Sequence, residues 1–259
     1  MLPLLSPKIH LGLGATYAAM ALVKGKRIIQ SEYLRFDRAI EKPWVAGIHA
    51  FNDWFNRQEM DAENIKTSVY LSSELAPFAL FPWQAESTDK VSQIGLAREY
   101  FNKVYGDLGE DREVVVSFTG FEQPWLASSI DMRLIEHFNN QLPQLALKRL
   151  QPLGVSMLRE RKIKASTYWL IVPEPQKMVA VYVNDQAPSL VRSLPIQALA
   201  GFSLKAILER ELRLSGQLSV DCEIYSTAKI EGMQSLLVSD WEINTHDLKF
   251  PVHLIGDPR

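Results

Sequence analysis

The sequence lacks several features that would narrow its function at once. Of 259 residues only Cys222 is a cysteine, so the chain can form neither an internal disulfide nor a cysteine zinc site. No apolar run approaches the roughly 20 residues of a membrane-spanning helix, and the proline-interrupted N-terminus lacks the basic start of a secretory signal. The net charge of −2 gives no electrostatic reason to expect nucleic acid. These absences predict a cytoplasmic globular protein.

Motifs for catalysis and cofactor binding are also missing. There is no Gly-x-x-x-x-Gly-Lys-Ser/Thr phosphate loop and no Gly-x-Ser-x-Gly nucleophile turn, and Tyr17 stands where a dinucleotide fingerprint beginning at Gly12 has its third glycine. The five histidines show no metal-ligand spacing, and Cys222 lies in an alternating pattern that favours a buried thiol over a nucleophile. We expect no metal and no cofactor.

What the sequence does contain is one order of elements that occurs twice. The first set is a series of apolar or alternating runs divided by turn residues, followed by a helical periodicity and a strand: 9–13, 18–23, 27–36, 44–55 and 66–71. The second set has the same order: 167–172, 178–183, 190–196, 203–212 and 218–225. The repetition predicts an α/β protein built from two copies of a strand-strand-strand-helix-strand unit.

The segment between the two sets predicts further elements. Apolar spacing over 94–104 favours a helix, and the run 113–118 is typical of a buried strand. Ser128 and Asp131 have capping-box spacing, which predicts the start of a long helix that Pro143 kinks or ends. The remaining strand candidates are 155–158, 234–238 and 241–243.

Two stretches resemble the actin-like ATPase superfamily, which includes actin, sugar kinases and the 70-kDa chaperones. Residues 9–16 (IHLGLGAT) resemble its first phosphate loop, and residues 178–196 are similar to the second-domain hairpin of the actin-like assembly proteins of type IV pili and type II secretion. The resemblance implies a two-lobed, ribonuclease H-like architecture in which each lobe is a mixed sheet with flanking helices. The lobes are expected at 1–150 and 151–259, with the second lobe shortened.

The resemblance also implies that the phosphate loops are degenerate. The family's first loop carries an Asp that organises the metal–water shell and, two residues later, a Gly; here His10 and Gly12 stand at those positions. An imidazole cannot replace a carboxylate toward Mg²⁺, which prefers oxygen ligands. Gly14 and Thr16 complete the first loop, and Glu174 lies in the second, where a glycine is expected. A member with these residues is expected to have lost ATP hydrolysis.

Two segments are candidates for binding a partner. Phe78, Phe81 and Trp83 lie in a proline-punctuated apolar stretch, which either folds over the core or forms an exposed docking patch. A basic stretch that begins at Lys148 and ends at Lys164 is either a solvated edge or a surface for an acidic partner or anionic lipid. Its candidate docking residues are Arg159, Arg161 and Lys162.

Two functional hypotheses follow. In the first, the chain is a non-catalytic scaffold of a pilus or secretion machine that binds the cytoplasmic tail of an inner-membrane assembly protein, with no transmembrane segment of its own and a peripheral position at the inner membrane. In the second, it is a diverged small-molecule kinase or another α/β transferase with a site between the lobes. The second hypothesis requires His10, Glu174 and Asp185 to converge.

Overall fold

The computed structural model describes most of the chain. The described residues are 6–25, 27–38, 42–58, 65–85, 89–106, 111–117, 122–140, 145–160, 163–195, 204–217, 222–226 and 243–244. The chain divides into two compact units, Met1–Ser156 and Met157–Arg259, each with its own sheet and core. The lobe boundary expected between 150 and 151 falls inside the last strand of the first sheet.

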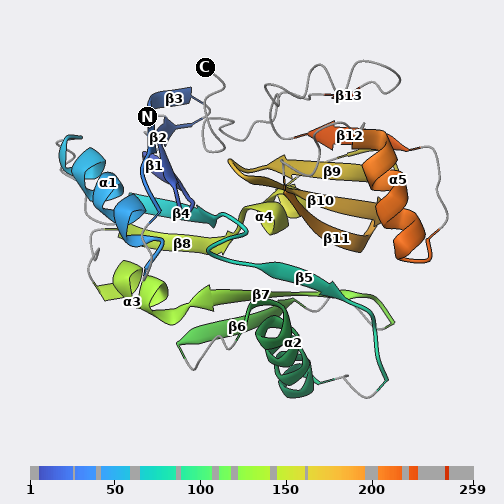
Figure 1. The fold of residues 1–259 in the computed structure, drawn as a ribbon. Helices are drawn as coiled ribbons and strands as arrows, with labels where there is room; N and C mark the ends of the chain where they lie inside the picture. The colour runs from blue at the N-terminus through green and yellow to red at the C-terminus, as the bar shows by residue number, and fades with distance from the viewer. Residues whose placement is uncertain are drawn as a thin grey trace. The chain divides into compact units, whose positions relative to one another are not determined.

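The first unit contains a five-stranded mixed sheet in the order β3-β2-β1-β4-β8 (Figure 1). Its strands are β1 (Lys8–Leu13), β2 (Tyr17–Lys24), β3 (Arg27–Arg35), β4 (Ile65–Leu71) and β8 (Leu145–Pro152). The strands β1, β2 and β3 form two successive antiparallel hairpins, whereas β4 runs parallel to β1 and β8 runs parallel to β4. The two hairpins and the fourth strand lie where the apolar and alternating runs predict them.

One face of this sheet carries the core of the first unit. Alternate residues of a strand point to the same face, and Ile9, Leu11 and Leu13 of β1 are fully buried there. Helix α1 (Val45–Asn56) covers this face and contributes Phe51 to the same cluster. The helical spacing of the aromatic residues in this segment therefore reflects core packing.

A smaller antiparallel sheet is inserted between β4 and β8. It has the order β5-β7-β6 and consists of β5 (Phe78–Phe81), β6 (Arg112–Ser117) and β7 (Trp125–Asp131). Helix α2 (Lys90–Tyr105) packs on one face of it through Ala97 and Phe101. Helix α3 (Met132–Asn140) follows β7 and packs against the core of the larger sheet through Leu134.

The second unit has the strand order β11-β10-β9-β12-β13. Its strands are β9 (Tyr168–Pro173), β10 (Lys177–Asn184), β11 (Ala187–Pro195), β12 (Glu223–Ser226) and β13 (Ile243–Asn244). Helix α5 (Leu204–Leu214) buries Leu208 and Leu212 in a cluster with Trp169 of β9. The short helix α4 (Leu153–Glu160) contains the boundary between the two units.

The three hairpin strands of the two units correspond residue by residue. Strands β1 and β9 both have 6 residues, β2 and β10 both have 8, and β3 and β11 both have 9. Each strand of the second copy begins and ends 160 residues after its counterpart. The irregularity in the β2–β3 ladder at Leu22/Val23 recurs in the β10–β11 ladder at Tyr182/Val183. The order of elements read from the sequence is therefore a repeat of one backbone unit.

Two predicted elements are wrong. Residues 125–131 form the buried strand β7, so the helix expected from Ser128 begins only after Asp131. Residues 155–158 belong to helix α4 rather than a strand, and the preceding strand β8 was not predicted.

The strand over 113–118 exists as β6, but it is a sheet edge with Val115 exposed rather than a buried strand. The candidate 234–238 and residues 241–242 lie outside the described residues.

Candidate functional site

The first expected phosphate loop is a closed hairpin turn. Gly14, Ala15 and Thr16 connect β1 to β2, and the Gly14 N–H donates to the Tyr17 carbonyl oxygen over 2.9 Å. The Tyr17 ring lies so close to Gly14 that an added Cβ would meet its Cε1 atom at 2.0 Å. Gly14 and Ala15 are buried, and Tyr17 is only 2% exposed. A side chain therefore covers the face of the turn at Gly14.

The second expected loop has the same backbone geometry. The Glu174 N–H donates to the Lys177 carbonyl oxygen over 2.8 Å, which repeats the first bond 160 residues later. Glu174 thus takes the position of Gly14, and Pro175 that of Ala15. The turn contains no glycine, a proline without an N–H, and a carboxylate that is 5% exposed. Because the first turn begins at Gly14, three residues separate it from His10.

His10 lies inside β1, between two neighbouring strands, and not at a strand end. It is half-buried, its ring stacks on Tyr70, and its Nδ1 atom lies 3.3 Å from the Tyr70 hydroxyl. Burial lowers the pKa of His10 below its ordinary value, and the positive charges of Lys8 and Arg149 lower it further. Both effects favour the neutral imidazole of His10.

The residues required by the enzyme hypothesis do not form one site. Glu174 precedes β10, whereas Asp185 follows its last residue in the turn to β11. An antiparallel strand of eight residues separates them, which corresponds to roughly 25 Å at about 3.4 Å per residue. Two groups so far apart cannot act on the same small substrate.

The apolar segment before α2 is mostly core. Phe78 and Phe81 belong to the edge strand β5 and are 7% and 6% exposed. The Phe81 ring stacks on Trp125 with a centroid distance of 4.3 Å. Trp83 lies after the strand and is half-buried. Of the two alternatives for this segment, the geometry of Phe78 and Phe81 fits core packing, and Trp83 remains a candidate for docking.

The basic stretch is divided among separate elements. Lys148 and Arg149 are exposed on β8 in the first unit, whereas Arg159 is exposed on α4 in the second. Arg161 and Lys162 lie outside the described residues. Although these cations are close in the sequence, the described ones lie on different elements and in different units.

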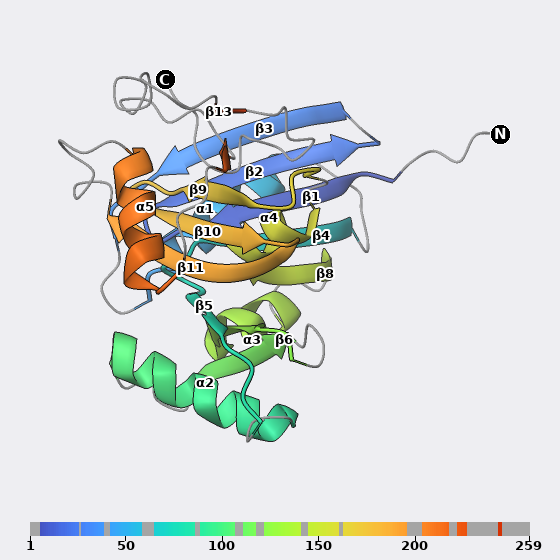
Figure 2. The same cartoon turned by 90° about the vertical axis from the view of Figure 1, so that its right-hand side faces the viewer.

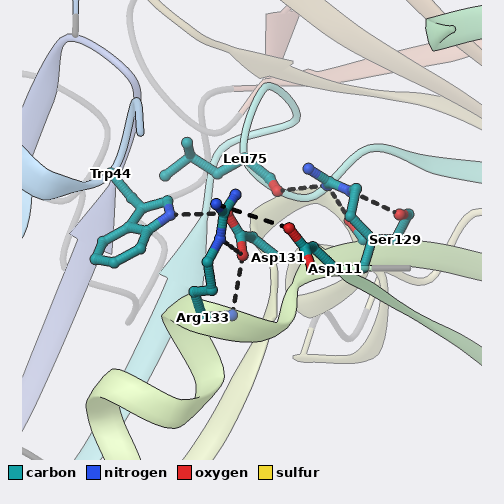
Figure 3. A network of polar contacts seen from close by, with 7 residues as sticks. Trp44, Leu75, Asp111, Ser129, Asp131 and Arg133 are labelled. Atoms are coloured by element: carbon teal, nitrogen blue, oxygen red, sulfur yellow. Dashed lines mark hydrogen bonds and ion pairs between the residues drawn. The ribbon is translucent and has the colours of Figure 1, made fainter. Parts of the chain in front are cut away.

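A polar network that the sequence did not predict surrounds Asp131 (Figure 3). This carboxylate accepts hydrogen bonds from the Trp44 indole, the Arg133 guanidinium and the Arg133 backbone N–H. Burial alone would raise the pKa of Asp131, but the hydrogen bonds from Arg133 and Trp44 outweigh it and hold the pKa below its usual range. The network joins the residue before α1 to the start of α3. The capping spacing of Asp131 was the only sequence signal for it.

Arg112 forms the second part of this network. Its guanidinium donates to the hydroxyl and the carbonyl oxygen of Ser129, and to the carbonyl oxygen of Leu75. Burial lowers the pKa of Arg112. The arrangement fastens the small sheet to the segment that follows β4, which is a structural role. Among the described residues no group of three or more His, Cys, Asp or Glu side chains could hold a metal ion.

These features define a fold class. No protein-family model matches the sequence, and no curated protein matches it. Solved structures show that the chain has the two-lobed fold of the actin-like ATPase superfamily, which confirms the expected architecture. Among the described helices none is both long and apolar enough to cross a lipid bilayer.

Three of the similar structures cover most of the chain. The cytoplasmic domain of EpsL, an inner-membrane component of the type II secretion system of Vibrio cholerae, has a TM-score of 0.59 at 9% identity, over 96% of this chain and 93% of that domain. PilM from a PilM–PilN type IV pilus biogenesis complex has a TM-score of 0.57 at 11% identity, over 90% and 83%. An actin-like protein of unknown function from Bacteroides thetaiotaomicron has a TM-score of 0.56 at 11% identity, over 91% and 88%.

Proposed function

We propose that the chain is a non-catalytic actin-like scaffold of a cell-envelope assembly machine, either a pilus or a secretion system. It binds the cytoplasmic segment of a membrane protein and acts in the cytoplasm, at the inner membrane. The observation that carries the proposal is the combination of backbone and side chains in the two hairpin turns, 14–17 and 174–177. Both keep the backbone bond of the repeated unit, while their side chains no longer suit a metal-bound phosphate.

The chemistry of the turns supports the absence of ATP hydrolysis. Mg²⁺ bound to nucleotide phosphates needs oxygen ligands, and none of Gly14, Ala15 and Thr16 supplies a carboxylate. The second turn has a carboxylate, that of Glu174, but its negative charge would repel a phosphate.

The choice of partner is supported by the structural neighbours. EpsL is described as an inner-membrane component, and PilM was solved in complex with PilN. We extend this kind of partnership to the present chain. The exposed Arg159 and the half-buried Trp83 are the described candidates for contact with the partner.

Two experiments test the proposal. Isothermal titration of the purified chain with ATP and Mg²⁺ should show no binding coupled to turnover; sub-micromolar binding with phosphate release would overturn it. Photo-crosslinking amino acids at Trp83 and Arg159, introduced in the native host, should capture an inner-membrane protein. The same amino acid at the exposed Lys24 provides the matched control, and equal capture from all three positions would contradict the assigned docking residues.

A further inference from the structure

The face of the first sheet opposite α1 carries polar side chains. On β1, Lys8 and His10 alternate with the core residues Ile9 and Leu11 and therefore point to the opposite face. On β4, Ser68 likewise alternates with the core residues. Figure 2 shows β1, β4 and β8 side by side in this sheet. Near the starts of β1 and β4, Lys8 and Lys66 are exposed.

Strand register places several cations together at this end of the face. Lys8 on β1 lies directly beside Lys66 on β4, because the two residues are register partners in a parallel pair. One pleat further along, His10 is beside Ser68, and Ser68 is beside Arg149 on β8. The register shift in the β4–β8 pair leaves Lys148 as an extra residue next to Arg149, and both are exposed.

The spacing of these residues is small. Neighbouring strands lie about 4.8 Å apart, and same-face residues of one strand lie roughly 6.7 Å apart. Lys8, Lys66 and Arg149 therefore lie within an area of the sheet that is two strand spacings wide and one pleat long. Lys148 lies at the bulge beside Arg149. The lowered pKa of His10, to which both Lys8 and Arg149 contribute, agrees with this proximity. We call this group the β1–β4–β8 cationic cluster.

The register pair of Lys8 and Lys66 places two positive charges side by side. Like charges placed directly opposite each other on neighbouring strands destabilise a sheet. Within the described part of the chain, no carboxylate forms an ion pair with Lys8, Lys66 or Lys148. A bound anion would remove the repulsion and would gain charge-assisted hydrogen bonds from three or four cations at once.

We propose that the β1–β4–β8 cationic cluster is a binding site for a phosphate-bearing anion. Lys8 and Lys66 provide ammonium groups and Arg149 adds a guanidinium, while Ser68 lies on the strand between β1 and β8. The separation of the cations fits one or two adjacent phosphate groups. The site is distinct from the degenerate turns because Lys8 begins β1, whereas Gly14 follows its end.

Binding has two possible sources of phosphate, which two arms of one experiment separate. The first arm titrates inorganic pyrophosphate into the full chain at fixed ionic strength. The second measures co-sedimentation with vesicles of phosphatidylglycerol and phosphatidylcholine, against vesicles of phosphatidylcholine alone. Lys66→Gln and Arg149→Gln are the test variants. Lys103→Gln on α2 removes an exposed cation outside the cluster and is the control.

Each test substitution should weaken binding about tenfold in the arm that shows it, because each removes a charge-assisted contact to the anion. Lys103→Gln should leave binding unchanged. In the NMR spectrum of the wild type, saturating pyrophosphate should raise the pKa of His10, because a neighbouring anion favours the imidazolium. No saturable binding in either arm, or equal losses in Lys66→Gln and Lys103→Gln, would overturn the proposal.

Discussion

The two copies of the hairpin unit share a backbone but not a surface. Their strands have equal lengths, their ladder irregularities fall at the same place, and their first turns are closed by the same N–H to carbonyl bond. Yet Gly14 under Tyr17 in one copy corresponds to Glu174 in the other. The strand register and the buried apolar residues therefore maintain the unit in both copies, while the residues of its first turn differ.

The copies also differ in what connects their last two strands. In the first copy the connection between β4 and β8 includes a whole three-stranded sheet with α2 and α3. In the second copy only residues 227–242 separate β12 from β13. The inserted sheet has its own aromatic core, centred on Trp125 and Phe101.

The largest effect should come from that inserted core. Phe81→Ala removes a buried ring that stacks on Trp125, and we expect the free energy of unfolding of the first unit to fall by about 3–5 kcal/mol. Urea denaturation followed by tryptophan fluorescence measures this. Trp83→Ala, at a half-buried position outside the strand, is the control and should cost much less. Equal losses would mean that the two aromatics do not divide into core and docking residues.

The closed first turn provides the next prediction. Gly14→Ala places a Cβ 2.0 Å from the buried Tyr17 ring, so the free energy of unfolding should fall by about 3 kcal/mol. Gly95→Ala in α2 is the matched control. A Cβ added there would meet no atom within 4 Å outside the helix's own backbone, so the free energy of unfolding should rise by about 0.5–1 kcal/mol. If Gly14→Ala left the stability unchanged in thermal and urea denaturation, the Tyr17 ring would not cover Gly14. The contrast between this turn and the Glu174 turn would then be wrong.

The network around Asp131 belongs to the first unit. Asp131→Asn removes the charge that Arg133 and Trp44 contact, and should lower the free energy of unfolding by about 2 kcal/mol at pH 7. The folded-state pKa of Asp131 is lowered, so its contribution is fully present above the unfolded-state pKa of about 4. The difference between wild type and variant should therefore shrink as pH falls through the lower folded-state pKa. A difference that stayed constant down to pH 2 would exclude the carboxylate as its source.

The smallest expected losses of stability concern one ion pair in each copy, which joins the third strand to the helix segment. In the first copy Glu32 pairs with Arg57, and in the second Arg192 pairs with Glu211. Glu32→Gln and Arg192→Gln should each cost about 0.5 kcal/mol, with the larger loss in the second, less exposed pair. Thermal denaturation at low and high salt checks this, since added salt should reduce the loss for Glu32→Gln more.

Much of the fold could be predicted because burial leaves a periodic trace. The alternation in β1 and β4 and the helical spacing in α1 each have one apolar face. The strand β7 left no such trace, because all seven of its residues are buried and its polar ones, such as Ser128 and Asp131, read as a helix start. Asp131 does accept from the N–H of Arg133 at the start of α3, so the capping signal was correct for that residue alone.

The candidate site was harder to predict than the fold. The Gly-x-Gly pattern allowed the turn to be placed at Gly12 or at Gly14, and only the bond between Gly14 and Tyr17 decides between them. The cationic cluster could not be predicted, because Lys8, Lys66 and Arg149 are far apart in the sequence and meet only through strand register.

The opposite polarity of the two ion pairs has a consequence for folding. A chain with two hairpin units of the same backbone geometry can pair the hairpin of one with the helix of the other, which is a typical error of repeated domains. In this chain such an exchange would place Glu32 against Glu211, and Arg192 against Arg57. Both mismatches are repulsive. The reversed charges at positions 32 and 192 would therefore disfavour such an exchange by the small free energy that partly exposed ion pairs contribute.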